Sequence, residues 1–150
     1  MKDLTLRQLL DPLPRRICTY FASQCTKDAI QRSGAKDPAV LLAQDVAERY
    51  GNGEDFDEAY LKEVANKASA FNATYASAVA YSAAYSAAAS AAAAYAAHSA
   101  AYAAASAYSV AVSADARAYY EENYKPLLLK ILNERLTPLE FMLYFGEEKK

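Results

Sequence analysis

The fold of this 150-residue chain is decided by the stretch from Ala68 to Ala114, which reads ASAFNATYASAVAYSAAYSAAASAAAAYAAHSAAYAAASAYSVAVSA. The stretch contains no Lys, Arg, Asp or Glu, and no Gly or Pro. Ala has the highest helix propensity and no helix breaker is present, so the stretch is predicted to be helical. Because it lacks the charged face that keeps a surface helix in water, it must pack against another part of this chain or against another molecule.

The length of this helical region indicates that it is interrupted. A single helix over residues 56–124 would be about 100 Å long, whereas a compact domain of this size is only about 40 Å across. Asn72, a good cap and a poor mid-helix residue, is the predicted first break. On a continuous helix the serines would form two stripes on nearly opposite sides: Ser82, Ser86 and Ser90, then Ser99, Ser106, Ser109 and Ser113. This change of phase indicates a second interruption between Ser90 and Ser99. One very long helix is the alternative.

Composition excludes several classes of protein. The chain has 16 Lys and Arg against 18 Asp and Glu, a net charge of -2. A generally basic nucleic-acid binder is therefore excluded, and the chain is too weakly acidic to imitate DNA by charge alone. Ala and Ser are only marginally apolar, so the stretch is not expected to span a membrane. The start, Met1-Lys2-Asp3, shows no secretory signal, and we expect a cytoplasmic protein.

Residues 1–54 are predicted to form short helices. Thr5 and Gln8 fit a capping box that starts the first helix, which ends before two prolines. An amphipathic helix follows over 15–34, since apolar and small residues recur at three- and four-residue spacing. Asp37 caps the next helix, which has Pro at its first position and closes at Gly51.

The remaining helices are predicted over residues 55–124 and 125–146. Asp55 and Glu58 fit a capping box at the start of the Ala-rich region. Pro126 ends or kinks that region, and a Leu-rich helix expected to be deeply buried follows. The sequence Thr137-Pro138-Leu139-Glu140 starts a last short helix that stops at Gly146. No period-two stretch indicates a strand, so we predict one all-α domain, a compact bundle of about six to eight helices.

The two cysteines are predicted to be buried free thiols. Cys18 and Cys25 are seven residues apart, which places them two turns apart on one helix face. Two turns rise about 10.5 Å, beyond the reach of a disulfide. Such thiols are typical of a reducing compartment, and the single His is too distant in sequence to complete a metal site with them.

The candidate binding residues of the Ala-rich stretch are tyrosines and one histidine. On a helical wheel five side chains fall within about 140° of each other: Tyr81, Tyr85, Tyr95, His98 and Tyr102. One interpretation is that these rings fill the gaps between closely packed Ala helices. The other is an exposed Tyr- and Ser-rich surface that binds a protein, because interface hot spots favour Tyr.

No catalytic motif is recognisable. His98 has no acidic residue or Cys within two helical turns, and no nucleophile elbow or phosphate-binding Gly-rich loop is present. The chain is therefore not expected to be an enzyme, and no cofactor or metal is expected.

The sequence resembles a family of small Ala-rich helical proteins of bacteria and phages described as immunity proteins. The matching features are Leu4–Leu10 (LTLRQLL), the segment 47-AERYGNGE-54, and Asp57-Glu58-Ala59-Tyr60 leading into an Ala/Tyr tract. The resemblance covers most of residues 4–136, and it implies binding and neutralisation of a protein partner.

These observations lead to two functional hypotheses. The first is a non-enzymatic module that binds a protein in an immunity or phage counter-defence role, through the Tyr and His side chains named above. The alternative is a structural protein whose Ala-rich stretch packs against its copy in a homodimer or larger bundle. No nucleic-acid or membrane partner is expected.

Overall fold

The computed structural model describes residues 4–34, 36–69, 86, 88–94, 103 and 124–146. Within these ranges the chain folds into helices, turns and short connections, and none of the described residues belongs to a β-strand. The predicted all-α class is therefore confirmed. The named helices are α1 (Leu6–Leu10), α2 (Arg15–Ser33), α3 (Pro38–Gly51), α4 (Glu58–Ser69), α8 (Lys125–Arg135) and α9 (Pro138–Phe145).

Three predicted helix starts are confirmed by their hydrogen bonds. The Thr5 hydroxyl accepts from the Gln8 amide at 3.2 Å, and the Gln8 side chain accepts from the Thr5 amide at 2.8 Å. Thr137 and Glu140 make the same reciprocal pair at 3.1 and 3.0 Å. The Asp37 carboxylate caps α3 by accepting from the Ala39 amide at 2.9 Å. Each cap satisfies amides that the first turn of a helix leaves without a partner.

The predicted capping box at Asp55 is wrong. Helix α4 begins at Glu58, and the Asp55 carboxylate instead forms an ion pair with the Arg16 guanidinium of α2. The Arg16 side chain also donates to the backbone carbonyls of Tyr50 and Glu54, at 2.7 and 3.1 Å. The Leu61 amide donates to the Asp57 carbonyl, so Asp57 and not Asp55 is the residue that precedes the helix.

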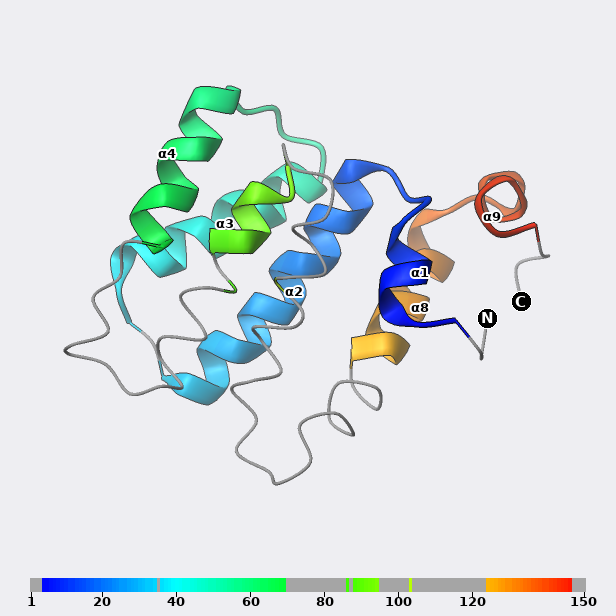
Figure 1. Ribbon diagram of the computed structural model, residues 1–150, viewed down its shortest axis with the longest axis horizontal. Coiled ribbons are helices and arrows are strands. Elements are labelled where there is room, and N and C mark those ends of the chain that lie inside the picture. Colours follow the sequence, from blue (N-terminus) through cyan, green and yellow to red (C-terminus); the bar gives the residue numbers. More distant parts are fainter. Residues whose placement is uncertain are drawn as a thin grey trace.

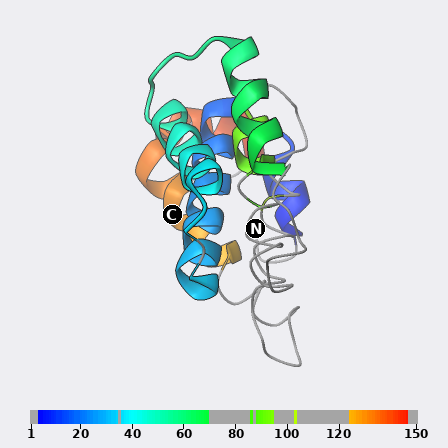
Figure 2. The ribbon, with the colours of Figure 1, turned by 90° about the vertical axis from the view of Figure 1, so that its left-hand side faces the viewer.

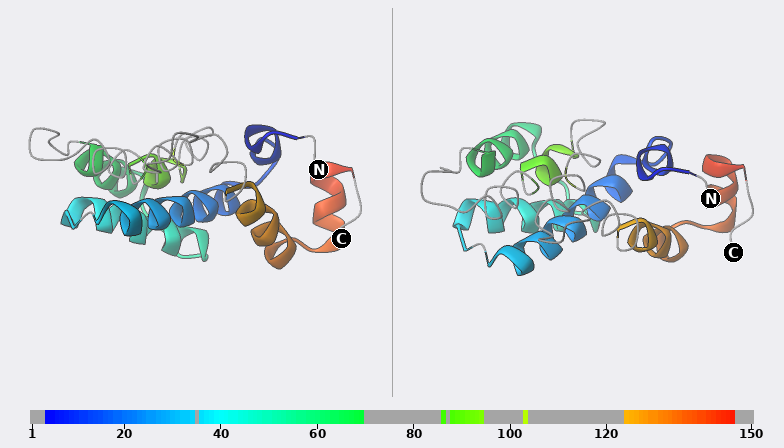
Figure 3. Two further views of the ribbon diagram at one scale, coloured as in Figure 1. Left: turned by 90° about the horizontal axis from the view of Figure 1, so that it is seen from below. Right: turned by 60° about the horizontal axis from the view of Figure 1, so that its bottom comes forward.

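Helix α2 is the axis on which the other helices are assembled (Figure 1). Helices α1, α8 and α9 gather at one end of the molecule, whereas α3 and α4 lie at the other end. Figure 2 looks onto the end that carries α3 and α4. The views in Figure 3 agree that α9 lies at the extremity opposite α4. Among the named helices the most extensive packing is between α2 and α3.

The interior is divided into two core clusters. The first contains Leu6, Leu9, Leu10 and Leu13; Cys18, Phe21, Ala22, Cys25 and Ala29; Ala93 and Ala103; Tyr124, Leu128, Ile131, Leu132, Leu136 and Phe141. The second contains Val40, Ala43 and Val46; Leu61, Val64, Ala65 and Ala68; Ala88, Ala91 and Ala94. The first cluster therefore joins α1 and α2 to α8 and α9, and the second joins α3 to α4.

The described part of the Ala-rich stretch contributes to both clusters. Residues 88–92 are helical. Residues 93–94 form a turn, which lies between Ser90 and Ser99, where the change of serine phase indicates an interruption. Ala93 faces the first core cluster, whereas Ala88, Ala91 and Ala94 face the second. Side chains as small as Ala allow this short segment to contact both clusters.

Candidate functional site

The five predicted binding residues, Tyr81, Tyr85, Tyr95, His98 and Tyr102, lie outside the described residues. So does Asn72, the predicted first break. The role of the four tyrosines and His98 as a contact surface therefore stays a prediction, and so does the break at Asn72.

The Ala-rich stretch is anchored to α2 through a buried hydroxyl pair. The Ser86 hydroxyl donates to the Ala103 carbonyl oxygen at 2.8 Å, and the Thr26 and Ser86 hydroxyl oxygens are 2.8 Å apart. Because the single Ser86 proton is directed at Ala103, Thr26 is the donor in the second bond. Both side chains are fully buried. This relay joins α2 to two parts of the stretch that are 17 residues apart.

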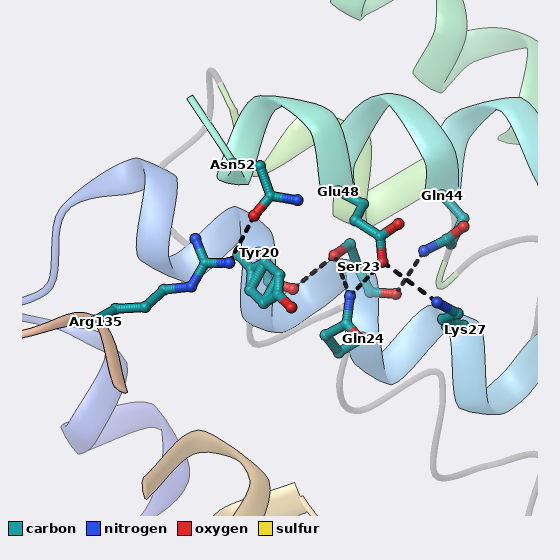
Figure 4. A network of polar contacts seen from close by, with 8 residues as sticks. All are labelled: Tyr20, Ser23, Gln24, Lys27, Gln44, Glu48, Asn52 and Arg135. Atoms are coloured by element: carbon teal, nitrogen blue, oxygen red, sulfur yellow. Dashed lines mark hydrogen bonds and ion pairs between the residues drawn. The ribbon is translucent and has the colours of Figure 1, made fainter. Parts of the chain in front are cut away.

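The interface between α2 and α3 contains a line of polar groups (Figure 4). The Glu48 carboxylate accepts from the Gln24 side-chain amide at 2.6 Å and lies 3.5 Å from the Lys27 ammonium. The Gln44 side-chain amide donates to the Ser23 carbonyl oxygen at 3.3 Å. These bonds fix the register of the two helices, since sliding either one by a turn would separate every pair.

The C-terminal end of α3 is held by two arginines. Arg16 from α2 donates to the Tyr50 carbonyl, and Arg135 from the end of α8 donates to the Gly51 carbonyl at 2.9 Å. The Arg135 guanidinium also lies 3.6 Å from the centroid of the Tyr20 ring and donates to the Asn52 side chain at 2.6 Å. Cations here satisfy the last carbonyls of the helix and oppose its negative end. Figure 4 shows Arg135 reaching Asn52 beside Tyr20.

A shallow depression of about 310 Å³ lies beside α2, lined by Gln24, Lys27, Asp28, Gln31, Arg32, Tyr124 and Leu127. The Tyr124 hydroxyl donates to the Asp28 carboxylate at 2.8 Å, and Arg32 pairs with the same carboxylate at 3.1 Å. The lysine of this depression pairs with Glu48. These groups therefore neutralise one another and hold Tyr124 against α2.

Both cysteines are buried free thiols, as predicted. Burial, with a smaller contribution from Asp11, raises the pKa of Cys18 to about 12. Burial, assisted by Asp28, also raises the pKa of Cys25 well above its ordinary value. A thiol acts as a nucleophile or a metal ligand through its thiolate, so neither cysteine is suited to these roles.

The part of the chain that the structure describes provides neither a metal cluster nor a membrane-spanning helix. In residues 4–34, 36–69, 86, 88–94, 103 and 124–146, no group of three or more His, Cys, Asp or Glu side chains is placed to hold a metal ion. Among those same residues, no helix has the length and apolarity needed to cross a bilayer.

Helix α9 presents an apolar face that the sequence analysis did not assign to a site. Phe141 points into the first core cluster and is 6% exposed, whereas Leu139 and Leu143 are 78% and 76% exposed. Met142, on the same outer face, is 47% exposed. The available signal was the composition of this helix: one charged residue in eight cannot supply a polar outer face.

Comparisons with protein-family models, with curated proteins and with solved structures found no match for this chain.

Proposed function

We propose that this protein is a non-enzymatic module that binds another protein, in an immunity or phage counter-defence role. The observation that carries the proposal is the charge-free stretch from Ala68 to Ala114, which contains six tyrosines. A surface without charges can be covered by a partner without removing charged groups from water. Tyr adds large, rigid contact area and a hydroxyl that stays hydrated at an interface rim.

The anchoring of the stretch supports this proposal. Ser86 and Ala103 are bonded to one another and, through Thr26, to α2, and Ala88, Ala91 and Ala94 pack against α3 and α4. The stretch is thus attached to a body whose helix register is fixed by hydrogen bonds. A contact surface attached to a body of fixed geometry needs less ordering on binding, which favours affinity.

The contact residues in this proposal are Tyr81, Tyr85, Tyr95, His98 and Tyr102. The test is capture of a partner from host lysate at moderate salt, using the tagged wild-type chain and its Tyr81→Ala and Tyr95→Ala variants. Tyr60→Ala is the matched control, because Tyr60 on α4 is an exposed ring that stacks on Phe56 outside the stretch.

We expect the wild-type and Tyr60→Ala chains to retain one stoichiometric partner. Truncation of a hot-spot tyrosine costs roughly 2 kcal/mol or more, so either stretch variant should bind about thirtyfold more weakly. The helical circular dichroism and the melting temperature of both variants should stay near the wild-type values. Loss of folding in both would place the rings in the core, and undiminished capture by both would remove them from the interface.

A further inference from the structure

We propose that the outer face of α9 pairs with α9 of a second copy of this chain, as a weak antiparallel dimer. The proposal goes beyond the partner-binding function above, because it concerns another surface and another occupant. It is carried by three side chains, Leu139, Met142 and Leu143, at the opposite end of the molecule from α4. We call them the α9 face.

The α9 face is a continuous apolar arc. At 100° per residue its three side chains span about 100° of the helix, and Phe141 lies on the opposite side. Phe141 is buried in the first core cluster and packs on Phe145, with ring centroids 5.1 Å apart. Thus the helix is held by its inner side while the outer arc is left without cover from the described residues.

The spacing of the face is self-complementary. An antiparallel pair of helices with its two-fold axis at position 141 brings Leu139 of one copy opposite Leu143 of the other. The two copies of Met142 then lie about 3 Å apart along the axis, near the centre. Met is flexible enough to fill the remaining gap. Such a contact uses the same patch on both chains, as closed two-fold dimers require.

Charge favours a second copy over a lipid surface. The one charged residue of α9 is Glu140, and its carboxylate accepts from the Thr137 amide at 3.0 Å in the capping box. No charge therefore falls within the apolar arc, so two copies can meet without repulsion. A helix that lies on a membrane carries Lys and Arg on its flanks, and α9 has neither.

The size of the face sets the strength of the dimer. The exposed fractions of Leu139, Met142 and Leu143 amount to about two whole side chains per copy. That is a patch of a few hundred Å², on the order of half of the roughly 800 Å² per partner in a standard interface. We therefore expect a dissociation constant between about 0.1 and 1 mM, rather than a permanent dimer.

Sedimentation velocity tests the proposal at protein concentrations from about 10 µM to about 1 mM, a range that spans the expected dissociation constant. The chains compared are the wild type, Leu139→Lys, Leu143→Lys and a matched control, Leu41→Lys. Leu41 is an exposed leucine on α3, 41% exposed, so the control makes the same change on a different surface. We expect the wild type and Leu41→Lys to dimerise, and either α9 variant to weaken the dimer at least tenfold. All four chains should share one melting temperature within a few degrees.

Cross-linking tests the antiparallel arrangement. Cys18 and Cys25 are buried, so they do not compete for a mild thiol oxidant. A mixture of Leu139→Cys and Leu143→Cys chains should form a disulfide-linked dimer faster than either variant alone.

Two results would overturn the proposal. One is a wild type that stays monomeric at about 1 mM, the weak limit of the expected dissociation constant. The other is a dimer that neither Lys variant weakens. Flotation with phosphatidylcholine vesicles that depends on Leu143, without a dimer, would instead assign the face to lipid.

The two proposals fail in different experiments. Loss of the α9 dimer in Leu143→Lys with undiminished capture of a partner from lysate would separate this surface from the tyrosines. Capture that requires Leu143 in a chain that does not dimerise would overturn the second-copy assignment and give the α9 face to that partner.

Discussion

Gly51 sets how closely α2 and α3 approach, and its substitution by Ala is the sharpest test of the packing. A Cβ placed on Gly51 would lie 2.5 Å from the Tyr20 Cβ, 2.7 Å from its Cα and 2.9 Å from its backbone nitrogen. Ordinary contact begins at 3.4 Å, so the helices would have to separate by about 0.9 Å at this point. No rotamer change relieves the contact, because its atoms belong to the backbone and to Cβ.

The cost follows from the groups joined at this point. Overpacking of this kind destabilises by roughly 1–3 kcal/mol. Displacement of α3 would also weaken the bond from Arg135 to the Gly51 carbonyl, and a hydrogen bond to a charged group is worth about 1.5–3 kcal/mol. Ala gains up to about 1 kcal/mol in helix propensity over Gly. We expect a net loss of about 3 kcal/mol, or about 6–12 °C in melting temperature.

The assay is thermal and urea unfolding followed by the negative circular dichroism band of the helices, with Gly34→Ala as the control. Gly34 ends α2 at φ 69° with no atom within 4 Å of an added Cβ, so its substitution costs only the left-handed backbone penalty, about 1–2 kcal/mol. Stability of Gly51→Ala equal to or above that of Gly34→Ala would refute the close approach of the two helices. Adding Tyr20→Ala should not restore stability, because the alanine keeps the Cβ.

Two further perturbations test the anchoring of the Ala-rich stretch and the burial of the thiols. Ser86→Ala leaves the Thr26 hydroxyl and the Ala103 carbonyl without this partner and should lower the free energy of unfolding in urea by about 1–3 kcal/mol. The double variant with Thr26→Val should lose less than the sum of the two single changes. Strict additivity would contradict the relay. The pKa of Cys18 is raised from 9.0 to about 12 on folding, so its contribution to stability is complete below pH 9 and is lost as the pH rises toward 12. By pH 10 the loss of unfolding free energy is about 1.4 kcal/mol. Cys18→Ala should therefore make the unfolding free energy fall less steeply with pH in this range. An unchanged slope would show that the thiol is solvated.

The sequence predicts the helices of this protein better than their contacts. The caps at Thr5, Asp37 and Thr137 are local patterns, and each forms as expected. Asp55 does not follow its pattern, since α4 begins only at Glu58 and the Asp55 carboxylate pairs with Arg16, which is 39 residues away in the chain. Gly51 is recognisable as the end of a helix, yet the need for a missing Cβ arises only when Tyr20 packs against it.

The candidate surfaces follow the same division. The composition of α9 requires that some apolar side chains face outward, but the choice of Leu139, Met142 and Leu143 depends on Phe141 entering the core. A helical wheel ranks side chains by angle and carries no information on which side meets the body of the protein. The tyrosine stripe, Tyr81 to Tyr102, is known from its angle alone and stays a prediction.

The first core cluster joins residues that are far apart in the chain, which affects synthesis. Phe21 and Cys25 of α2 share this cluster with Leu128 and Leu132 of α8, which come more than 100 residues later. At about 5–20 residues per second, the ribosome needs roughly 5–20 s to make the intervening chain. During that time the apolar side of α2 has no contact with α8. Helices α2 and α3 can therefore pair early, whereas the side of α2 that belongs to the first cluster stays open to aggregation until α8 has been made.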